Sequence, residues 1–376
     1  MNIWIDGYEA NESQRLGSSQ VAFELIKHFE KIDKQNTYTV LLPGKPLYDL
    51  PKERNGWRYK VLKPKRLWTK VALPLSLYTA KLKPQVFFSP THYIPSFSPS
   101  SVKRIVTIFD LSFLYFPKMF NKKDLWQLIS WTKYSALNAD HIITISNFSK
   151  KDICEQYKVD KSRVTVAYPG YDRDKFKVQG SKFKVDETKN KYNLGDNYNY
   201  IIYIGTIQPR KNLIRLIEAV SRIDNLALVI VGKTSGEGRG GWMYEETLSA
   251  PQEYAVADRV KFLGFVPTED LLYLLSGAKA YILPSLWEGF GIPVLEAMAC
   301  GVPVIVSNVS SLPEVVGKAG LLIDPYSVSQ IEQAIRTVVT DKKLQSKYSK
   351  AALEQVKKFS WEKTAKAVLK VFENFA

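Results

Sequence analysis

The sequence predicts an α/β protein with two doubly wound, Rossmann-like domains that face each other across a cleft. Short apolar runs alternate with amphipathic helical patterns along the whole chain, as in proteins with parallel sheets. The 376 residues are too many for one ordinary core. The alternation also fades into a polar stretch between Asp172 and Tyr198, which is typical of an inter-domain connection.

The first half of the chain contains apolar runs that predict strands and periodic patterns that predict helices. The strands are expected at Asn2–Asp6, Tyr38–Leu42, Arg58–Leu62, Val86–Ser89, Arg104–Ile108, His141–Ile145 and Val164–Ala167. Helices are expected at Ser18–Ile32 and Lys122–Asn138, where apolar side chains recur every three or four residues. We therefore expect residues 1–180 to form an N-terminal domain and residues 181–198 to form the connector.

The second half repeats this alternation and predicts a second parallel sheet. Its strands are expected at Tyr200–Ile204, Leu226–Val231, Val260–Leu263, Ala280–Leu283, Pro303–Val306 and Leu321–Ile323, and its helices at Leu213–Arg222, Glu269–Ser276, Pro293–Cys300 and Val328–Val339. Residues 199–358 would form this domain, and residues 359–376 a C-terminal helix that packs back toward the first. Ligands of such sheets bind at the carboxyl ends of the strands.

Composition excludes several classes of protein. Hydrophobic residues make up 45% and charged residues 24% of the chain, which indicates a globular protein. No apolar run is long enough to predict a membrane span, and the first residues lack the pattern of a secretory signal. Cys154 and Cys300 lie in apolar helical patterns, so we expect both to be buried and reduced. A cytoplasmic location is the prediction.

The first motif with chemical meaning is GTIQPRKNL, residues 205–213, between a strand and a helix. Gly205, followed by Thr206, lets the backbone approach a ligand closely. The next helix begins with unpaired amides, and Arg210 and Lys211 add two cations at the same place. This combination favours a diphosphate, although a surface turn with two solvated cations is the simpler alternative.

The second motif is PSLWEGFGIPVLEAMACGVPVI, residues 284–305, which also leads from a strand into a helix. Gly289 and Gly291 flank Phe290, so the loop amides can turn toward a sugar or a phosphate. Glu288 lies in the loop and Glu296 in the first turns of the helix. Two carboxylates at such a junction can accept hydrogen bonds from two sets of sugar hydroxyls.

These motifs resemble the retaining family-4 glycosyltransferases of the GT-B fold, in particular the bacterial mannosyltransferase- and rhamnosyltransferase-like members that build surface polysaccharides. Further similar stretches are GWMYEE (241–246), KFLGFVP (261–267), SNVSSLPEVVGKAGLLIDP (307–325) and FSWEKTA (359–365) in the second half, and TIFDLSFLYFP (107–117), ITISNFSKKDI (143–153) and VAYPG (166–170) in the first half. The resemblance covers nearly all of residues 199–376.

The resemblance implies a role for each matching residue. It implies that Glu288 contacts the transferred sugar and that Glu296 binds the nucleotide ribose, while Arg210 and Lys211 neutralise the diphosphate. It further implies donor contacts in the two domains, at Gly17, Asp110, Gly205, Thr206, Val266, Phe290 and Gly291. The donor would be a GDP- or UDP-linked hexose, with mannose favoured. The acceptor would be a lipid-linked or oligosaccharide chain bound by the first domain, and no cofactor is implied.

One position departs from the family pattern. Many relatives have a histidine before the aspartate that corresponds to Asp110, whereas this chain has Phe109. His92, at the end of the preceding strand, is a candidate to replace that histidine in catalysis. The substitution leaves open a second function, that of a nucleotide-sugar-binding pseudoenzyme or assembly partner.

Charge is distributed unevenly along the chain. Residues 1–190 contain 32 Lys and Arg and 18 Asp and Glu, a net charge of +14 out of +16. An anionic membrane surface or a nucleic acid would fit this charge, as would a lysine-rich solvated surface. No nucleic-acid-binding motif is present, so nucleic acid is not expected.

The segment Trp57–Lys70, WRYKVLKPKRLWTK, interleaves basic and aromatic residues and predicts peripheral contact with the inner face of the plasma membrane. A strand followed by a solvated loop explains the same residues. Pro64 is expected to prevent a continuous amphipathic helix here.

The motifs supply their own cations, so we predict that catalysis needs no metal ion. Asp172 and Asp174 form a D-x-D pattern, but no buried strand precedes it and we expect it to be solvated. Transfer measured with excess EDTA should therefore proceed at the rate found with added Mg²⁺. A strict requirement for Mg²⁺ or Mn²⁺ would contradict this prediction and would implicate Asp172 and Asp174.

Overall fold

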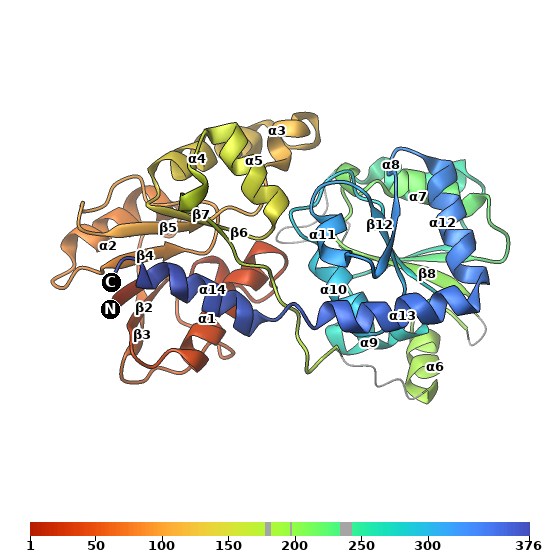
Figure 1. The fold of residues 1–376 in the computed structure, drawn as a ribbon, viewed down its shortest axis with the longest axis horizontal. Coiled ribbons are helices and arrows are strands. Elements are labelled where there is room, and N and C mark those ends of the chain that lie inside the picture. The colour runs from red at the N-terminus through yellow and green to blue at the C-terminus, as the bar shows by residue number, and fades with distance from the viewer. Residues whose placement is uncertain (177–181, 196–197, 234–242) are drawn as a thin grey trace. The chain divides into compact units, whose positions relative to one another are not determined.

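The computed structural model describes residues 1–176, 182–195, 198–233 and 243–376 (Figure 1). The chain forms two compact units, one of Met1–Gly170 with Ser360–Ala376 and one of Tyr171–Phe359. Each unit is built on one parallel sheet, so the predicted fold class of two parallel-sheet α/β domains is confirmed. Gly241 and Trp242 of the GWMYEE motif, and parts of the expected connector, lie outside the described residues.

The first sheet has seven strands in the order β3-β2-β1-β4-β5-β6-β7. They are β1 (Asn2–Asp6), β2 (Thr37–Leu42), β3 (Trp57–Val61), β4 (Val86–Ser89), β5 (Lys103–Thr107), β6 (His141–Thr144) and β7 (Val164–Val166). The strand order reverses between β1 and β4, which pair directly through Ile3 and Val86. This reversal is a topological switch point, the usual position of a ligand site in such sheets.

Helices cover both faces of the first sheet because successive strand residues point to opposite sides. On one face, Phe88 of β4 contacts Phe29 of α1 (Ser18–Ile32) and Phe372 of α14 (Trp361–Glu373). Figure 1 shows α14 beside α1, so the end of the chain completes the first unit.

The opposite face carries two further groups of helices. Trp4 and Phe87 lie in a core with the π-helical turn η2 (Trp68–Ala72) and α2 (Leu73–Thr79). The adjacent core, under β5 and β6, is covered mainly by α4 (Lys122–Asn138) and α5 (Asn147–Tyr157). The shorter elements of this unit are η1 (Glu9–Asn11), α3 (Ser112–Tyr115), η3 (Pro117–Met119) and η4 (Lys161–Arg163).

The second sheet has six strands in the order β10-β9-β8-β11-β12-β13, with its switch point between β8 and β11. The strands are β8 (Tyr200–Ile204), β9 (Ala227–Val231), β10 (Val260–Gly264), β11 (Tyr281–Leu283), β12 (Val304–Ser307) and β13 (Gly320–Ile323). The helices are α6 (Lys182–Lys191), η5 (Pro209–Lys211), α7 (Leu213–Ser221), α8 (Glu245–Glu253), α9 (Thr268–Gly277), α10 (Ile292–Ala299), α11 (Leu312–Val316), α12 (Val328–Thr340) and α13 (Lys342–Val356).

Every strand predicted from the sequence is present, with each end within one residue of the expected position. Cys154 and Cys300 are free and buried, as predicted. One expectation about the domain boundaries is wrong. The expected connector over residues 181–198 contains α6, which packs against α9 in the second unit, and the units divide at Gly170 and Phe359. In the segment 57–70, a strand is followed by a loop and no helix runs through Pro64, as expected, but the π-helical turn η2 already begins at Trp68, where its apolar side chains pack on the sheet.

Candidate active site

The carboxyl end of β8 lies at the switch point of the second sheet, and its backbone is tightly packed there. Gly205 has a φ of +157°, and a Cβ at this position would lie 2.7 Å from the Tyr203 hydroxyl. A Cβ at Gly232, after β9, would lie 1.8 Å from the carbonyl oxygen of Gly205. Both positions therefore require glycine. Sequence reasoning identified Gly205 and missed Gly232, whose importance comes from the neighbouring strand.

The two cations predicted to bind phosphate lie on η5, in the loop after β8. Asn212 ends this turn with a φ of +61°. The Asn212 side-chain amide donates to the carbonyl oxygens of Pro284 (3.0 Å) and Pro325 (2.6 Å). The backbone amide of Leu286 also donates to the Arg210 carbonyl at 2.9 Å. These contacts hold the loop after β8 against the loop after β11.

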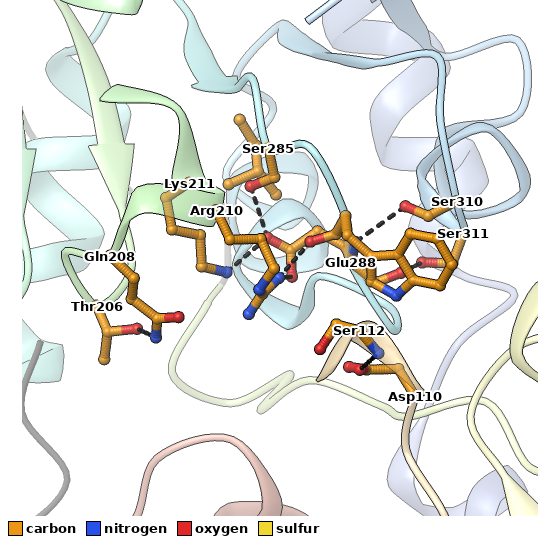
Figure 2. Close-up of polar contacts among 12 residues, drawn as sticks. Asp110, Ser112, Thr206, Gln208, Arg210, Lys211, Ser285, Glu288, Ser310 and Ser311 are labelled. Atoms are coloured by element: carbon orange, nitrogen blue, oxygen red, sulfur yellow. Dashed lines mark hydrogen bonds and ion pairs between the residues drawn. The ribbon is translucent and has the colours of Figure 1, made fainter. Parts of the chain in front are cut away.

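Glu288 brings the two predicted motifs together (Figure 2). Lys211 Nζ donates to Glu288 Oε1 at 2.5 Å, and Ser285 Oγ donates to the same oxygen at 2.7 Å. Arg210 Nη1 lies 3.5 Å from Glu288 Oε2 and also donates to the carbonyl oxygen of Trp287. We refer to Arg210, Lys211 and Glu288 as the charge cluster.

Two serines that follow β12 fix the backbone of Glu288. The Glu288 amide donates to Ser310 Oγ at 2.9 Å, and Ser311 Oγ donates to the Glu288 carbonyl at 2.8 Å. The position of this carboxylate is therefore set from three loops, those after β8, β11 and β12. Sequence reasoning missed Ser310 and Ser311, which lie in the resembling SNVSSLPEVVG stretch but carry no signal of their own.

The charge cluster keeps Glu288 ionised although the side chain is buried. Burial alone would raise the pKa of Glu288, but Lys211 and Arg210 outweigh it and lower the pKa below its ordinary value. The Nε of Arg210 is buried and has no hydrogen-bond partner among the described residues. The cluster therefore has two cations around one carboxylate and a guanidinium donor that a ligand oxygen can satisfy.

Glu296 differs from Glu288 in its electrostatics. It lies on α10, whose first residue follows Gly291, a glycine with a φ of +94°. Burial, with a smaller contribution from Asp172, raises the pKa of Glu296 to about 7. Among the described residues the Glu296 carboxyl has no hydrogen-bond or ion-pair partner. Glu288 and Glu296 are separated by seven residues in the sequence, a spacing that we call the E-x7-E pattern. The pKa values of these two glutamates are shifted in opposite directions.

The remaining predicted residues of the second unit are placed as follows. Phe290 is buried, with its ring 5.6 Å from that of Phe359, so only its backbone is available for a ligand. Val266 is buried, whereas the adjacent Phe265 is about half exposed and has Lys233 Nζ 5.8 Å from its ring centroid. Thr206 Oγ1 accepts from the Gln208 side chain at 2.6 Å.

In the first unit, Gly17 is exposed at the start of α1 and has a φ of +57°. Asp110 accepts a hydrogen bond from the Ser112 amide at 2.8 Å. The ring of His92 lies 5.2 Å from that of Phe109, the residue that occupies the position of the family's histidine. A histidine is therefore present next to this position, contributed by the loop that follows the neighbouring strand β4.

A cavity of about 250 Å³ lies at the switch point of the first sheet. Asp6 ends β1, and Thr91 follows β4; the other lining residues that matter here are Tyr8, Lys65, Arg66, Lys70, Tyr93 and Trp131. Lys70 Nζ lies 4.8 Å from the Trp131 ring centroid, and Lys65 Nζ 5.8 Å from that of Tyr8. Burial raises the pKa of Asp6 to about 7, so its negative charge is weakened. The cavity thus combines aromatic surface with three basic side chains.

We predict that Glu296→Gln stabilises the protein in a pH-dependent way. The folded-state pKa of about 7 lies above the ordinary value of 4.5, so the native carboxyl loses stability as pH rises between these values. Urea unfolding should show a gain of about 1–3 kcal/mol for the variant at about pH 8 and little gain at about pH 5. Glu354→Gln, at an exposed position on α13, is the control. An equal effect of Glu296→Gln at both pH values would show that this carboxyl does not titrate near neutrality.

Sequence comparison places both units in known families. Residues 17–175 match the family described as "Glycosyltransferase Family 4", and residues 184–355 match "Glycosyl transferases group 1". The chain is 33% identical over 287 residues to O-antigen chain mannosyltransferase B of Escherichia coli, over 74% of this chain and 72% of that protein. It is 31% identical over 240 residues to the serotype-specific mannosyltransferase WbdA of Escherichia coli, over 62% of this chain but only 29% of the relative.

Solved structures with low identity show the same fold. Sucrose-phosphate synthase from Thermosynechococcus elongatus superimposes with a TM-score of 0.78 at 20% identity, over 99% of this chain and 98% of that chain. HepE from Anabaena, in complex with UDP-glucose, gives a TM-score of 0.75 at 17% identity, over 99% of both chains. Together with the matches over both units, these findings show that the chain belongs to the group 1, family 4 glycosyltransferases and has their two-domain GT-B fold.

Proposed function

We propose that the chain is a retaining glycosyltransferase that transfers a hexose, with mannose favoured, from a nucleoside-diphosphate sugar. The acceptor is a lipid-linked or glycan chain in surface polysaccharide biosynthesis. The observation that carries this proposal is the charge cluster at the β8–β11 switch point. The names of the two Escherichia coli mannosyltransferases support mannose as the transferred sugar. The HepE complex with UDP-glucose supports a nucleotide sugar as the donor.

Charge development during transfer explains why this cluster is suited to the reaction. The bond between the sugar and the diphosphate breaks, and negative charge grows on the departing nucleoside diphosphate. Preorganised cations aimed at such a leaving group contribute a large part of catalysis. Arg210 and Lys211 are held in place before the donor binds, and the Arg210 Nε still lacks a hydrogen-bond acceptor among the described residues. These two residues also take the place of a metal ion, which makes the reaction metal-independent.

Glu288 acts first as a positioning residue for these cations. A carboxylate offers about four acceptor positions. Lys211 and Ser285 already occupy two of them, and Arg210 lies beside a third. The position that is left can accept one hydroxyl of the transferred sugar. Glu288 therefore combines a structural role in the cluster with the sugar contact expected from the sequence.

Glu296 is the residue with unused acceptor capacity, and we assign it to the ribose hydroxyls of the donor. Hydrogen bonds from hydroxyls favour the ionised carboxyl, so nucleotide binding would lower its raised pKa. The backbone amides of Phe290 and Gly291 approach the sugar and phosphates, as does the backbone at Gly205 and Thr206. Val266 frames the base. The family resemblance also implies donor contacts at Gly17 and Asp110, which lie in the first unit.

The anomeric configuration of the transferred sugar is retained if the acceptor oxygen attacks the same face from which the diphosphate departs. The new bond forms between the anomeric carbon and the acceptor oxygen, and the acceptor's hydroxyl proton passes to an oxygen of the departing diphosphate. This step requires no carboxylate nucleophile and no cofactor. His92, beside Phe109, donates to a hydroxyl of the transferred sugar in place of the family's histidine.

The acceptor binds in the cavity at the switch point of the first sheet. Aromatic surface with a few polar groups is typical of small-molecule sites, and the rings of Tyr93 and Trp131 can pack on a sugar. Lys65, Arg66 and Lys70 would bind a phosphate of the acceptor. The free cysteines are consistent with a location in the cytoplasm. The excess of basic residues in the first unit is consistent with peripheral contact at the inner face of the plasma membrane.

Arg210→Ala should lower the transfer rate by ~10²–10³-fold, because the developing charge on the diphosphate loses a preorganised donor. Release of nucleoside diphosphate from a panel of GDP- and UDP-sugars measures this rate. Arg222→Ala, which removes a largely exposed guanidinium from the same unit, should leave it unchanged. Activity of Arg210→Ala within a few-fold of that of the native chain would show that Arg210 is not part of the site.

The same sugar panel tests the alternative function. A native chain that is stabilised by nucleotide but transfers none of these sugars would favour the pseudoenzyme suggested by Phe109.

Trp131→Ala should raise the KM for a soluble acceptor analogue by about tenfold while donor KM is unchanged, because the ring belongs to the cavity of the first unit. Trp126→Ala is the matched control, since Trp126 lies on the same helix α4 and is 62% exposed. Equal effects of the two substitutions on acceptor KM would exclude this cavity as the acceptor site.

A further inference from the structure

The outer face of η2 and α2 is apolar, which is unusual for a surface helix. The inner face, with Trp68, Leu73 and Leu77, is buried in the core of the first unit. The outer face and its flanking residues expose five large apolar side chains, each between 38% and 71% accessible: Leu67, Val71, Leu75, Tyr78 and Leu82. The spacing of Leu67, Val71, Leu75 and Tyr78 by three or four residues places these four along one side of the helical segment, and Leu82 follows shortly after α2 ends at Thr79. We call these five residues the apolar stripe.

A helix that is apolar on both faces normally has a partner on each of them. Single exposed apolar residues are common on protein surfaces and need no explanation. Five exposed large apolar side chains between residues 67 and 82 are different, because apolar patches of this kind mark interaction sites with proteins or membranes. The fold of the first unit covers the inner face of this helix and leaves the stripe accessible.

The charges around the stripe indicate what covers it. Between residues 54 and 109 the sequence contains eleven Lys and Arg and no Asp or Glu. Six of these basic residues flank the stripe at its two ends: Lys63, Lys65, Arg66, Lys70, Lys81 and Lys83. All six are exposed, and in the described part of the chain none of them forms an ion pair. A surface of this composition complements an apolar layer covered by negative charges.

We propose that the apolar stripe docks on an anionic lipid bilayer, with its five side chains inserted at the level of the headgroups. Lys63, Lys81 and Lys83, which do not line the proposed acceptor cavity, would then contact lipid phosphates. None of the described helices is long and apolar enough to cross a membrane, so the segment would lie along the surface. This docking is independent of the glycosyl transfer proposed above, since it needs neither donor nor acceptor.

The proposal replaces the aromatic anchors expected from the sequence. Trp57 is 1% accessible and Trp68 is 7% accessible, so neither ring reaches the surface. Trp68 Nε1 instead donates to the Asp6 carboxylate at 2.9 Å inside the first unit. Leu75, Tyr78 and Leu82, beyond the end of the segment 57–70, provide the contact instead.

Co-sedimentation of the full chain with vesicles tests the proposal. Vesicles of phosphatidylcholine alone are compared with vesicles that also contain phosphatidylglycerol, at low and at high salt. We expect binding to the anionic vesicles and a marked decrease in high salt, because the lysines act through screened charges. The double variant Leu75→Gln/Tyr78→Gln should bind at least about tenfold less, since it removes apolar surface without changing charge. Lys81→Gln/Lys83→Gln should reduce binding to anionic vesicles by a similar factor.

Phe183→Gln is the matched control, because Phe183 is 74% exposed and lies in the second unit, on α6. This variant should bind like the native chain. Urea unfolding midpoints and transfer to a soluble acceptor should be unchanged in the stripe variants, which separates loss of docking from loss of fold or of catalysis. Equal binding by the native chain and Leu75→Gln/Tyr78→Gln, or no binding to anionic vesicles at low salt, would overturn the proposal. So would self-association of the native chain that the double variant abolishes, since a second copy would then cover the stripe.

Discussion

The ion pair between Lys211 and Glu288 joins the two halves of the second sheet at its switch point, and the candidate donor site depends on it. Lys211 follows β8 and Glu288 follows β11, so the contact fixes the distance between the two loops that would hold the donor. A buried ion pair is favourable only if its remaining polar groups are satisfied. Ser285, Ser310 and Ser311 meet this condition for Glu288. Loss of Glu288 would leave two cations without their carboxylate, and loss of Lys211 would leave the buried carboxylate with Arg210, at 3.5 Å, as its ion partner in the cluster.

The same environment gives the two glutamates of the E-x7-E pattern different chemical properties. Glu288 is surrounded by cations and stays ionised, whereas Glu296 is partly buried without a partner among the described residues and has a raised pKa. One carboxyl is therefore part of the framework that holds Arg210 and Lys211. The other has a pKa of about 7 and can therefore change its protonation state near neutral pH. A sequence motif that looks symmetrical thus encodes one fixed and one responsive acid.

Much of the fold is readable from the sequence because buried parallel strands are short continuous apolar runs. Val86–Ser89 and Tyr200–Ile204 match the observed strands at both ends. The helical segment that begins at Trp68 could not be predicted from the sequence in this way. It lacks a polar face, so it shows no amphipathic period, and Pro74 lies in the first turn of α2, where proline is tolerated.

Contacts between distant residues account for the rest of what the sequence could not predict. Both motifs of the charge cluster were recognised, but the pairing of Lys211 with Glu288 spans 77 positions and has no local signal. The need for glycine at position 232 arises only from the adjacent Gly205. The cavity of the first unit draws its residues from four separate parts of the chain, and no single part has the composition of a binding site.

The return of α14 to the first unit affects how the protein is made. Phe372 packs against Phe29 and Phe88, so the core of the first unit includes a side chain that is synthesised after the whole of the second unit. Domains usually fold in the order in which they leave the ribosome. Here the second unit has all of its residues before the first unit has its final helix. Until α14 has been synthesised, Phe88 and Phe29 on that face of the sheet lack one of their partners, so the nascent first unit exposes apolar surface while the second unit is being made.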